Sequence, residues 1–137
     1  MSGDDHDRGT ASVETAIAIV ALLAMAFFIV GALRIVGTGG DVDSAARAGA
    51  RAAAGEYNQV AAQAAASAVV SSALSDRGVA CQNLAVAVSG DLSPGSVVSV
   101  DVSCTVGLND VVLAGFPGSR TVSGHGVEYV DVVRGGA

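Results

Sequence analysis

The chain has 137 residues, of which 51% are hydrophobic and only 4% are aromatic, and its net charge is −6. This length allows one small domain beside a long apolar segment, and the scarcity of bulky side chains predicts a thinly packed core. The seven basic residues, all of them arginine, form no basic stripe of the kind that binds phosphates, so a nucleic-acid partner is excluded.

A long apolar run occupies residues 10–36 and follows a polar, acidic leader at residues 1–9. No charged residue occurs from Thr15 to Leu33, and a helix over this stretch rises about 1.5 Å per residue, close to the ~30 Å hydrocarbon core of a bilayer. The run therefore predicts a transmembrane helix. Glu14 stands at its upstream edge. An acid there suggests a function, although the helix dipole also favours a carboxylate in a first turn.

Residues 37–55 are predicted to continue the helix, with a kink or break at Gly37–Gly40, since each glycine costs about 1 kcal/mol in a helix interior. Arg47 and Arg51 are four residues apart, which places both guanidinium groups on one helix face. They are candidates for helix packing, because the small residues on the other face let a neighbouring helix approach closely. A solvated alanine-arginine helix is the alternative.

Residues 56–137 are expected to form a small α+β domain. A second helix is predicted over about 57–76, with Gly78 as its C-terminal stop and a weak apolar stripe from Val60 through Ala64, Ala68 and Val69 to Leu74. Alternating apolar residues then predict strands at about 79–89, 96–107 and 120–133, the first two joined by a turn at Gly90–Gly95. The fold class is therefore α+β, with a long N-terminal helix, a second helix and about three antiparallel strands.

Cys81 and Cys104 lie far in sequence from His6 and His125, which argues against a zinc site. A disulfide is expected if this domain lies outside the cytoplasm, and two unpaired buried cysteines are the alternative. Placing the cysteines directly opposite each other sends the valines of the two strands to opposite sheet faces. We therefore expect a bulge near Gln82 or Asn83, or a register shifted by one residue.

The remaining polar residues do not suggest chemistry. His125, between Gly124 and Gly126, is interpreted as a surface residue, and the apolar segment 111–117 as a part of the core or an exposed contact patch. The sequence has no nucleophile paired with a base, no metal-ligand cluster and no paired carboxylates at useful spacing. We expect no catalytic residue, no bound metal and no cofactor.

The arrangement of Gly9, four small or neutral residues, Glu14 and a long apolar helix resembles the type IV prepilin signal. With the Ala- and Arg-rich helical continuation and the small β domain, the chain resembles TadE-like pseudopilins, minor subunits of tight-adherence pilus systems. The resemblance implies that a prepilin peptidase cuts between Gly9 and Thr10. It also implies that Glu14 is recognised by the peptidase or the assembly machinery and then pairs with the Thr10 ammonium of a neighbouring subunit.

The implied partners are the prepilin peptidase, other pilin-like subunits, the inner-membrane assembly platform and the membrane itself. The implied location is a single-pass anchor with the C-terminal domain outside the cytoplasm. Arg8 precedes the apolar run whereas Arg34, Arg47 and Arg51 follow it, which does not favour this orientation by the positive-inside rule. The alternative is a secreted or tethered binding domain released by signal peptidase at Ala24-Met25-Ala26.

Overall fold

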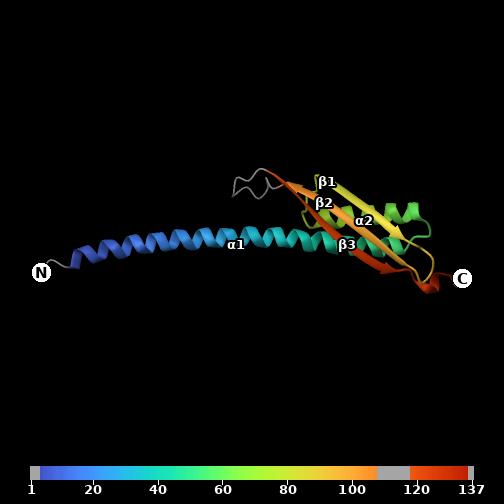
Figure 1. The fold of residues 1–137 in the computed structure, drawn as a ribbon, viewed down its shortest axis with the longest axis horizontal. Coiled ribbons are helices and arrows are strands. Elements are labelled where there is room, and N and C mark those ends of the chain that lie inside the picture. The colour runs from blue at the N-terminus through green and yellow to red at the C-terminus, as the bar shows by residue number, and fades with distance from the viewer. Residues whose placement is uncertain (1–3, 108–117, 136–137) are drawn as a thin grey trace. The chain divides into compact units, whose positions relative to one another are not determined.

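The computed structural model describes residues 4–107 and 118–135. It contains helices α1 (Asp4–Ala54) and α2 (Gln59–Asp76), strands β1 (Asn83–Gly90), β2 (Val97–Gly107) and β3 (Ser119–Tyr129), and a 3-10 helix, η2 (Val132–Gly135) (Figure 1). The strands form one antiparallel sheet in the order β1-β2-β3. The predicted α+β class is confirmed. The apolar segment 111–117 lies outside the described residues, so its role stays a prediction.

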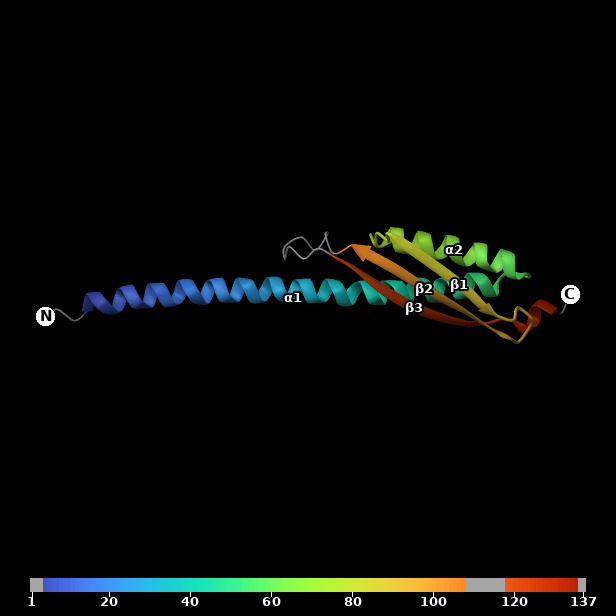
Figure 2. The ribbon, with the colours of Figure 1, turned by 45° about the horizontal axis from the view of Figure 1, so that its top comes forward.

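The chain divides into two compact units, Met1–Ile35 and Val36–Ala137. The described part of the first unit consists of the N-terminal part of α1. The second unit contains the rest of α1 together with α2 and the sheet, and Figure 2 shows β3 crossing α1 while α2 lies beside β1. The small core of the protein therefore belongs to the second unit.

Helix α1 joins two segments that the sequence analysis separated, 10–36 and 37–55. The break expected at Gly37–Gly40 does not occur, because the α-helix runs without interruption through these residues. Glycine keeps its backbone N–H, so it weakens a helix without removing a hydrogen bond as proline does. A Cβ added at Gly39 would lie 3.9 Å from Val122 Cγ1 of β3, so this part of the helix also gains support from the sheet.

Local capping residues fix both ends of α2. The Asn58 side chain accepts a hydrogen bond from the Ala61 N–H at 2.9 Å, as an N-cap does. At the other end Gly78 adopts a positive φ of 69°, and the Val79 N–H donates to the Leu74 carbonyl at 2.9 Å. This is the glycine stop that the sequence predicted.

The buried face of α2 differs from the predicted stripe. Its buried residues are Ala62, Ala66, Val70 and Leu74, whereas Val60, Ala64 and Ala68 are exposed. The reason is close packing at a glycine of α1. A Cβ added at Gly49 would lie 2.7 Å from Val70 Cγ2 and 3.5 Å from both the Ala66 carbonyl oxygen and Val100 Cγ1 of β2. The shape of α1 thus selects the face of α2 that is buried.

The hairpin of β1 and β2 has a register that places the valines together without a bulge. Pairing is continuous from Asn83 opposite Thr105 to Gly90 opposite Val98, so Val86 lies opposite Val102. In this register Cys104 lies opposite Leu84, three residues after Cys81. The expected bulge is absent, and the register is shifted by three residues from direct pairing of the cysteines instead of by one. A shift by any odd number of residues moves the β1 valines to the other face of the sheet. In the observed register they therefore share the face of the β2 valines, which packs against the helices.

Strand ends also differ from the expected ranges. β1 begins at Asn83 instead of about 79, because Val79 closes the end of α2. β3 ends at Tyr129 instead of 133. The Val130 N–H still donates to the Ser96 carbonyl at 2.8 Å, and the Asp131 carboxylate then accepts from the Val133 N–H at 2.9 Å, which turns the chain into η2.

Candidate functional site: the apolar segment of α1 and its polar head

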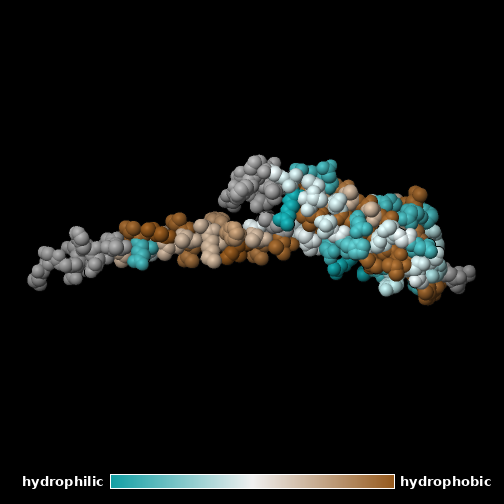
Figure 3. Space-filling model, in the orientation of Figure 1, coloured by the Kyte–Doolittle hydropathy of each residue, from teal (hydrophilic) through white to brown (hydrophobic). Residues whose placement is uncertain are grey.

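The first unit consists of helix with an apolar surface that nothing in the described structure covers. Its large apolar side chains are between about half and four-fifths exposed, and Figure 3 shows apolar colours along this segment. A contiguous apolar surface of this size is rare on monomeric soluble proteins and marks a membrane or protein contact. These side chains are Val13, Ile17, Ile19, Val20, Leu22, Leu23, Met25, Phe27, Phe28, Ile29, Val30 and Leu33.

Helical structure suits this segment to a bilayer because every interior backbone N–H and C=O is paired within the helix. Thr15, the first residue of the uncharged run, is satisfied in the same way, since its hydroxyl donates to the Ala11 carbonyl at 2.8 Å. Among the described residues one helix, over Ala11–Ala54, is long and apolar enough to cross a membrane, and its most apolar window is wholly unburied. A buried core helix of a soluble protein is therefore excluded.

The polar head of this segment contains the three residues predicted to direct processing and assembly. Gly9 and Thr10 both lie within α1, so the structure places the bond between them inside a helical turn. Glu14 follows Thr10 by about one helical turn and is exposed.

Arg47 and Arg51 do not contact a neighbouring helix in the described structure. Arg47 donates to Asp43 Oδ2 at 2.6 Å, and Arg51 Nε lies 3.6 Å from Glu128 Oε2 of β3. Both side chains are largely exposed, so each ion pair contributes little to stability. The small residues of the opposite face pack instead against the sheet and α2. They include Ala45, Ala46, Gly49, Ala50 and Ala53, all buried.

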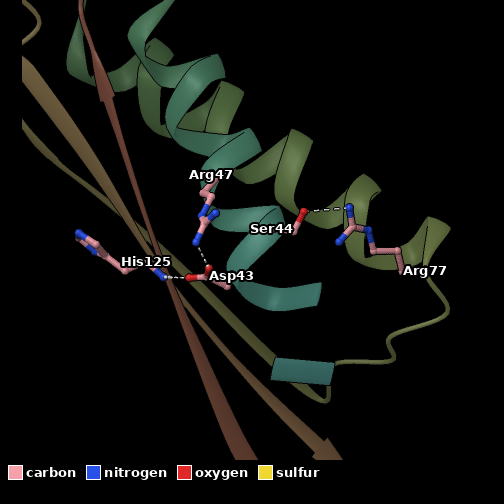
Figure 4. Close-up of polar contacts among 5 residues, drawn as sticks. All are labelled: Asp43, Ser44, Arg47, Arg77 and His125. Carbon is pink, nitrogen blue, oxygen red and sulfur yellow. Dashed lines mark hydrogen bonds and ion pairs between the residues drawn. The ribbon is translucent and has the colours of Figure 1, made fainter. Parts of the chain in front are cut away.

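A polar cluster that the sequence did not reveal joins α1 to its neighbours (Figure 4). Asp43 accepts from Arg47 and, through Oδ1, from the backbone N–H of His125 at 3.3 Å. Arg77, just after α2, donates to Ser44 Oγ at 2.9 Å and to Asp41 Oδ1 at 3.3 Å. Apart from Asp43 and Arg47, which are four residues apart, these partners are between 33 and 82 residues apart, so no local sequence pattern could have identified them.

The His125 side chain points away from this cluster, as Figure 4 shows, and lies on the exposed face of the sheet. Its Nδ1 is 2.7 Å from Asp101 Oδ1 on β2. No group of three or more His, Cys, Asp or Glu side chains converges among residues 4–107 and 118–135 in a way that could hold a metal ion. The pair is a surface contact between strands.

Cys81 and Cys104 form a disulfide, which links the segment before β1 to the buried side of β2. Of the two alternatives for the cysteines, the structure therefore has the paired one. The β1–β2 turn is held separately by Asp91, whose carboxylate accepts from the Ser93 hydroxyl at 2.9 Å and from the Ser93 N–H at 3.1 Å. These two hydrogen bonds lower the pKa of Asp91 below its usual value.

Comparison with known proteins gives one match. The family model described as TadE-like protein matches residues 9–51, which begins at Gly9 and covers the apolar segment and most of the remainder of α1. No curated protein and no solved structure matches the chain. The resemblance inferred from the sequence is confirmed for this segment.

Proposed function

From the TadE-like match over residues 9–51, we propose that the protein is a membrane-anchored, pilin-like subunit that acts without catalysis in assembling a tight-adherence pilus. The observation that carries this proposal is the unburied apolar helix with the exposed Glu14 at its head. The helix supplies the anchor, and the carboxylate supplies a recognition group. The partners are the prepilin peptidase, other pilin-like subunits and the inner-membrane platform.

Processing is proposed between Gly9 and Thr10. The family match begins at Gly9, the residue that precedes this bond. Because the bond lies within α1, a peptidase must open the helical turn around it. Glycine lowers the cost of that opening, since it is less favourable than alanine in a helix by about 1 kcal/mol.

Glu14 is proposed to pair with the new Thr10 ammonium of a neighbouring subunit. Away from water such a pair is far stronger than on a protein surface, but both charges must be desolvated, so its main effect is on the register between subunits. Glu14→Gln removes the charge and keeps the shape of the side chain. We expect reduced processing or assembly for Glu14→Gln, with Thr15→Val as the matched neutral control. Normal behaviour of Glu14→Gln in both steps would contradict this role.

The domain that follows Val36 is proposed to lie outside the cytoplasm. The disulfide supports this orientation, because disulfides persist in oxidising compartments. The arginine distribution favours the opposite orientation. The redox state of the two cysteines in cells can decide between the two orientations. After alkylation of free thiols in intact cells, Cys81 and Cys104 should remain unlabelled until a reductant is added. Complete labelling without reductant would place the domain in the cytoplasm.

The intact mass of the mature protein tests the proposed function. Loss of residues 1–9 supports processing as a pilin. Loss of residues 1–26 supports the second candidate function, a domain released by signal peptidase after Ala26, which the compactness of the unit Val36–Ala137 permits. That outcome would remove the anchor and refute the assembly role.

A further inference from the structure

The two edges of the sheet are treated differently, and this difference indicates where another strand can bind. An edge strand exposes unpaired N–H and C=O groups, which form a template for an added strand unless the protein covers them. At the β1 edge, α2 covers them with two glutamines. Gln63 Nε2 donates to the Val86 carbonyl at 2.7 Å and Gln63 Oε1 accepts from the Val88 N–H at 3.0 Å, while Gln59 Nε2 donates to the Val88 carbonyl at 2.9 Å. This edge is therefore covered at its middle, at Val86 and Val88.

The β3 edge is covered at one point only among the described residues. In an antiparallel sheet, residues that bond to the neighbouring strand alternate with residues that face the free edge. His125 faces the edge, because its N–H donates to Asp43 of α1. Ser119, Thr121 and Ser123 share its parity and are exposed, and the outward N–H and C=O groups of Thr121 and Ser123 have no hydrogen-bond partner within the described chain.

We propose that Ser119–Ser123 of β3 binds the same segment of a second copy of this chain, antiparallel and centred on Thr121. Thr121 then lies opposite Thr121 of the second copy, and Ser119 lies opposite Ser123 of the second copy. The outward N–H and C=O groups of the three residues meet equivalent groups across a twofold axis. Such an interface is isologous and closes after two copies.

Three observations favour a second copy bound through β3. The two glutamines occupy the outward groups of Val86 and Val88 in the middle of β1, which disfavours head-to-tail addition of β3 to β1 of another copy. The exposed sheet face already pairs like hydroxyls across strands, with Thr105 Oγ1 3.1 Å from Thr121 Oγ1, and a second β3 extends this row. The segment contains no lysine or proline, the usual protection of an edge, and its one charge, Arg120, lies opposite Val122 of the second copy, away from like charge.

The geometry also determines how the two copies approach. The twofold axis is normal to the sheet, and α1 packs on one sheet face, so the two α1 segments after Val36 run in opposite directions. The contact therefore joins two domains that are antiparallel to each other along α1. A five-residue pairing is smaller than a stable interface requires, so the contact is expected to be weak and is best detected by trapping it with a cross-link.

Register-specific cross-linking of the full chain in detergent micelles tests this inference. In the proposed pair the two Thr121 Cα atoms are about 5.5 Å apart, within the range of a disulfide, whereas the two Ser123 Cα atoms are more than about 13 Å apart. Two differently tagged Thr121→Cys chains should form a mixed disulfide-linked dimer on mild oxidation. Ser123→Cys, on the same face and strand, should form none. Cys104 points to the opposite face, so the native disulfide is left in place.

A second variant separates strand pairing from random collision. Proline is tolerated on an edge strand where the lost N–H faces solvent, and the Ser123 N–H faces outward. Ser123→Pro in the Thr121→Cys chain should abolish the cross-link while calorimetry shows that the domain remains folded. Absence of the Thr121→Cys dimer, equal dimer from Ser123→Cys, or a cross-link that survives Ser123→Pro would each overturn the inference. None of these outcomes bears on processing at Gly9.

Discussion

Replacement of Gly124 by alanine tests the contact that holds the sheet against α1. A Cβ added at Gly124 would lie 2.6 Å from the Val42 carbonyl oxygen and 2.7 Å from the Asp43 nitrogen, and neither backbone atom can rotate away. Relief requires α1 and β3 to separate by roughly 1 Å, against an ordinary contact distance near 3.5 Å. The φ of Gly124 is not positive, so the expected effect comes from lack of space and not from backbone strain.

The magnitude follows from two opposing effects. Overpacking costs about 1–3 kcal/mol, while replacing glycine reduces the entropy of the unfolded chain and returns about 0.4–1 kcal/mol. The net destabilisation should be about 1–2 kcal/mol, and a domain of about 100 residues should lose roughly 5–15 °C in Tm. Differential scanning calorimetry of the full chain in detergent micelles measures this change.

Gly40→Ala is the matched control, since a Cβ at Gly40 meets nothing within 4 Å and the residue lies inside the continuous α1. The same chemical change should raise stability there by about 0.5–1 kcal/mol, because alanine is the better helix former. An unchanged or raised Tm for Gly124→Ala would refute the proposed close packing. A lowered Tm for Gly40→Ala would contradict an uninterrupted helix at this point.

Three further measurements examine the second unit. Gln63→Ala removes two hydrogen bonds that cover the β1 edge and should lower the free energy of unfolding by about 1–3 kcal/mol in urea titrations. A change smaller than the experimental error would show that these hydrogen bonds do not stabilise the domain. Cys104→Ser should cost about 3 kcal/mol, as expected for opening a loop of this length to Cys81, and calorimetry should give the same loss after reduction of the native protein. Ser93→Ala should raise the pKa of Asp91 toward its usual value in an NMR titration. The lowered pKa means that the ionised Asp91 supports the turn above the usual carboxyl range and loses that support as the pH falls through that range. Ser93→Ala should weaken this acid dependence, since the backbone N–H of residue 93 still donates to Asp91.

Features that depend on neighbouring residues in the chain were predictable. The uncharged run before Leu33 predicts an apolar helix because hydropathy and length alone decide whether a helix suits a bilayer. Gly78 predicts the end of α2 because only glycine readily adopts the positive φ of that cap. The glycine-rich turn after Gly90 predicts the β1–β2 hairpin, since turn chemistry is local.

Features that depend on fit between distant surfaces were not predictable. The buried face of α2 contains Ala62 and Ala66 instead of Ala64 and Ala68, and alanine hydropathy does not distinguish these faces. Gly49 of α1 makes the distinction by leaving room for Val70. The same holds for Asp43 and His125, whose contact depends on how α1 crosses β3.

A long apolar helix with a carboxylate near its start, and a small α+β domain after it, could be read from the amino-acid sequence alone, because periodicity, glycine placement and charge act over a few residues. Three features required the tertiary structure: α1 passes unbroken through Gly37–Gly40, the hairpin register differs by three residues from the cysteine alignment, and α2 covers the middle of one sheet edge while part of the other is open. These features depend on which surfaces meet, and small side chains carry too little hydropathic contrast to specify that in advance.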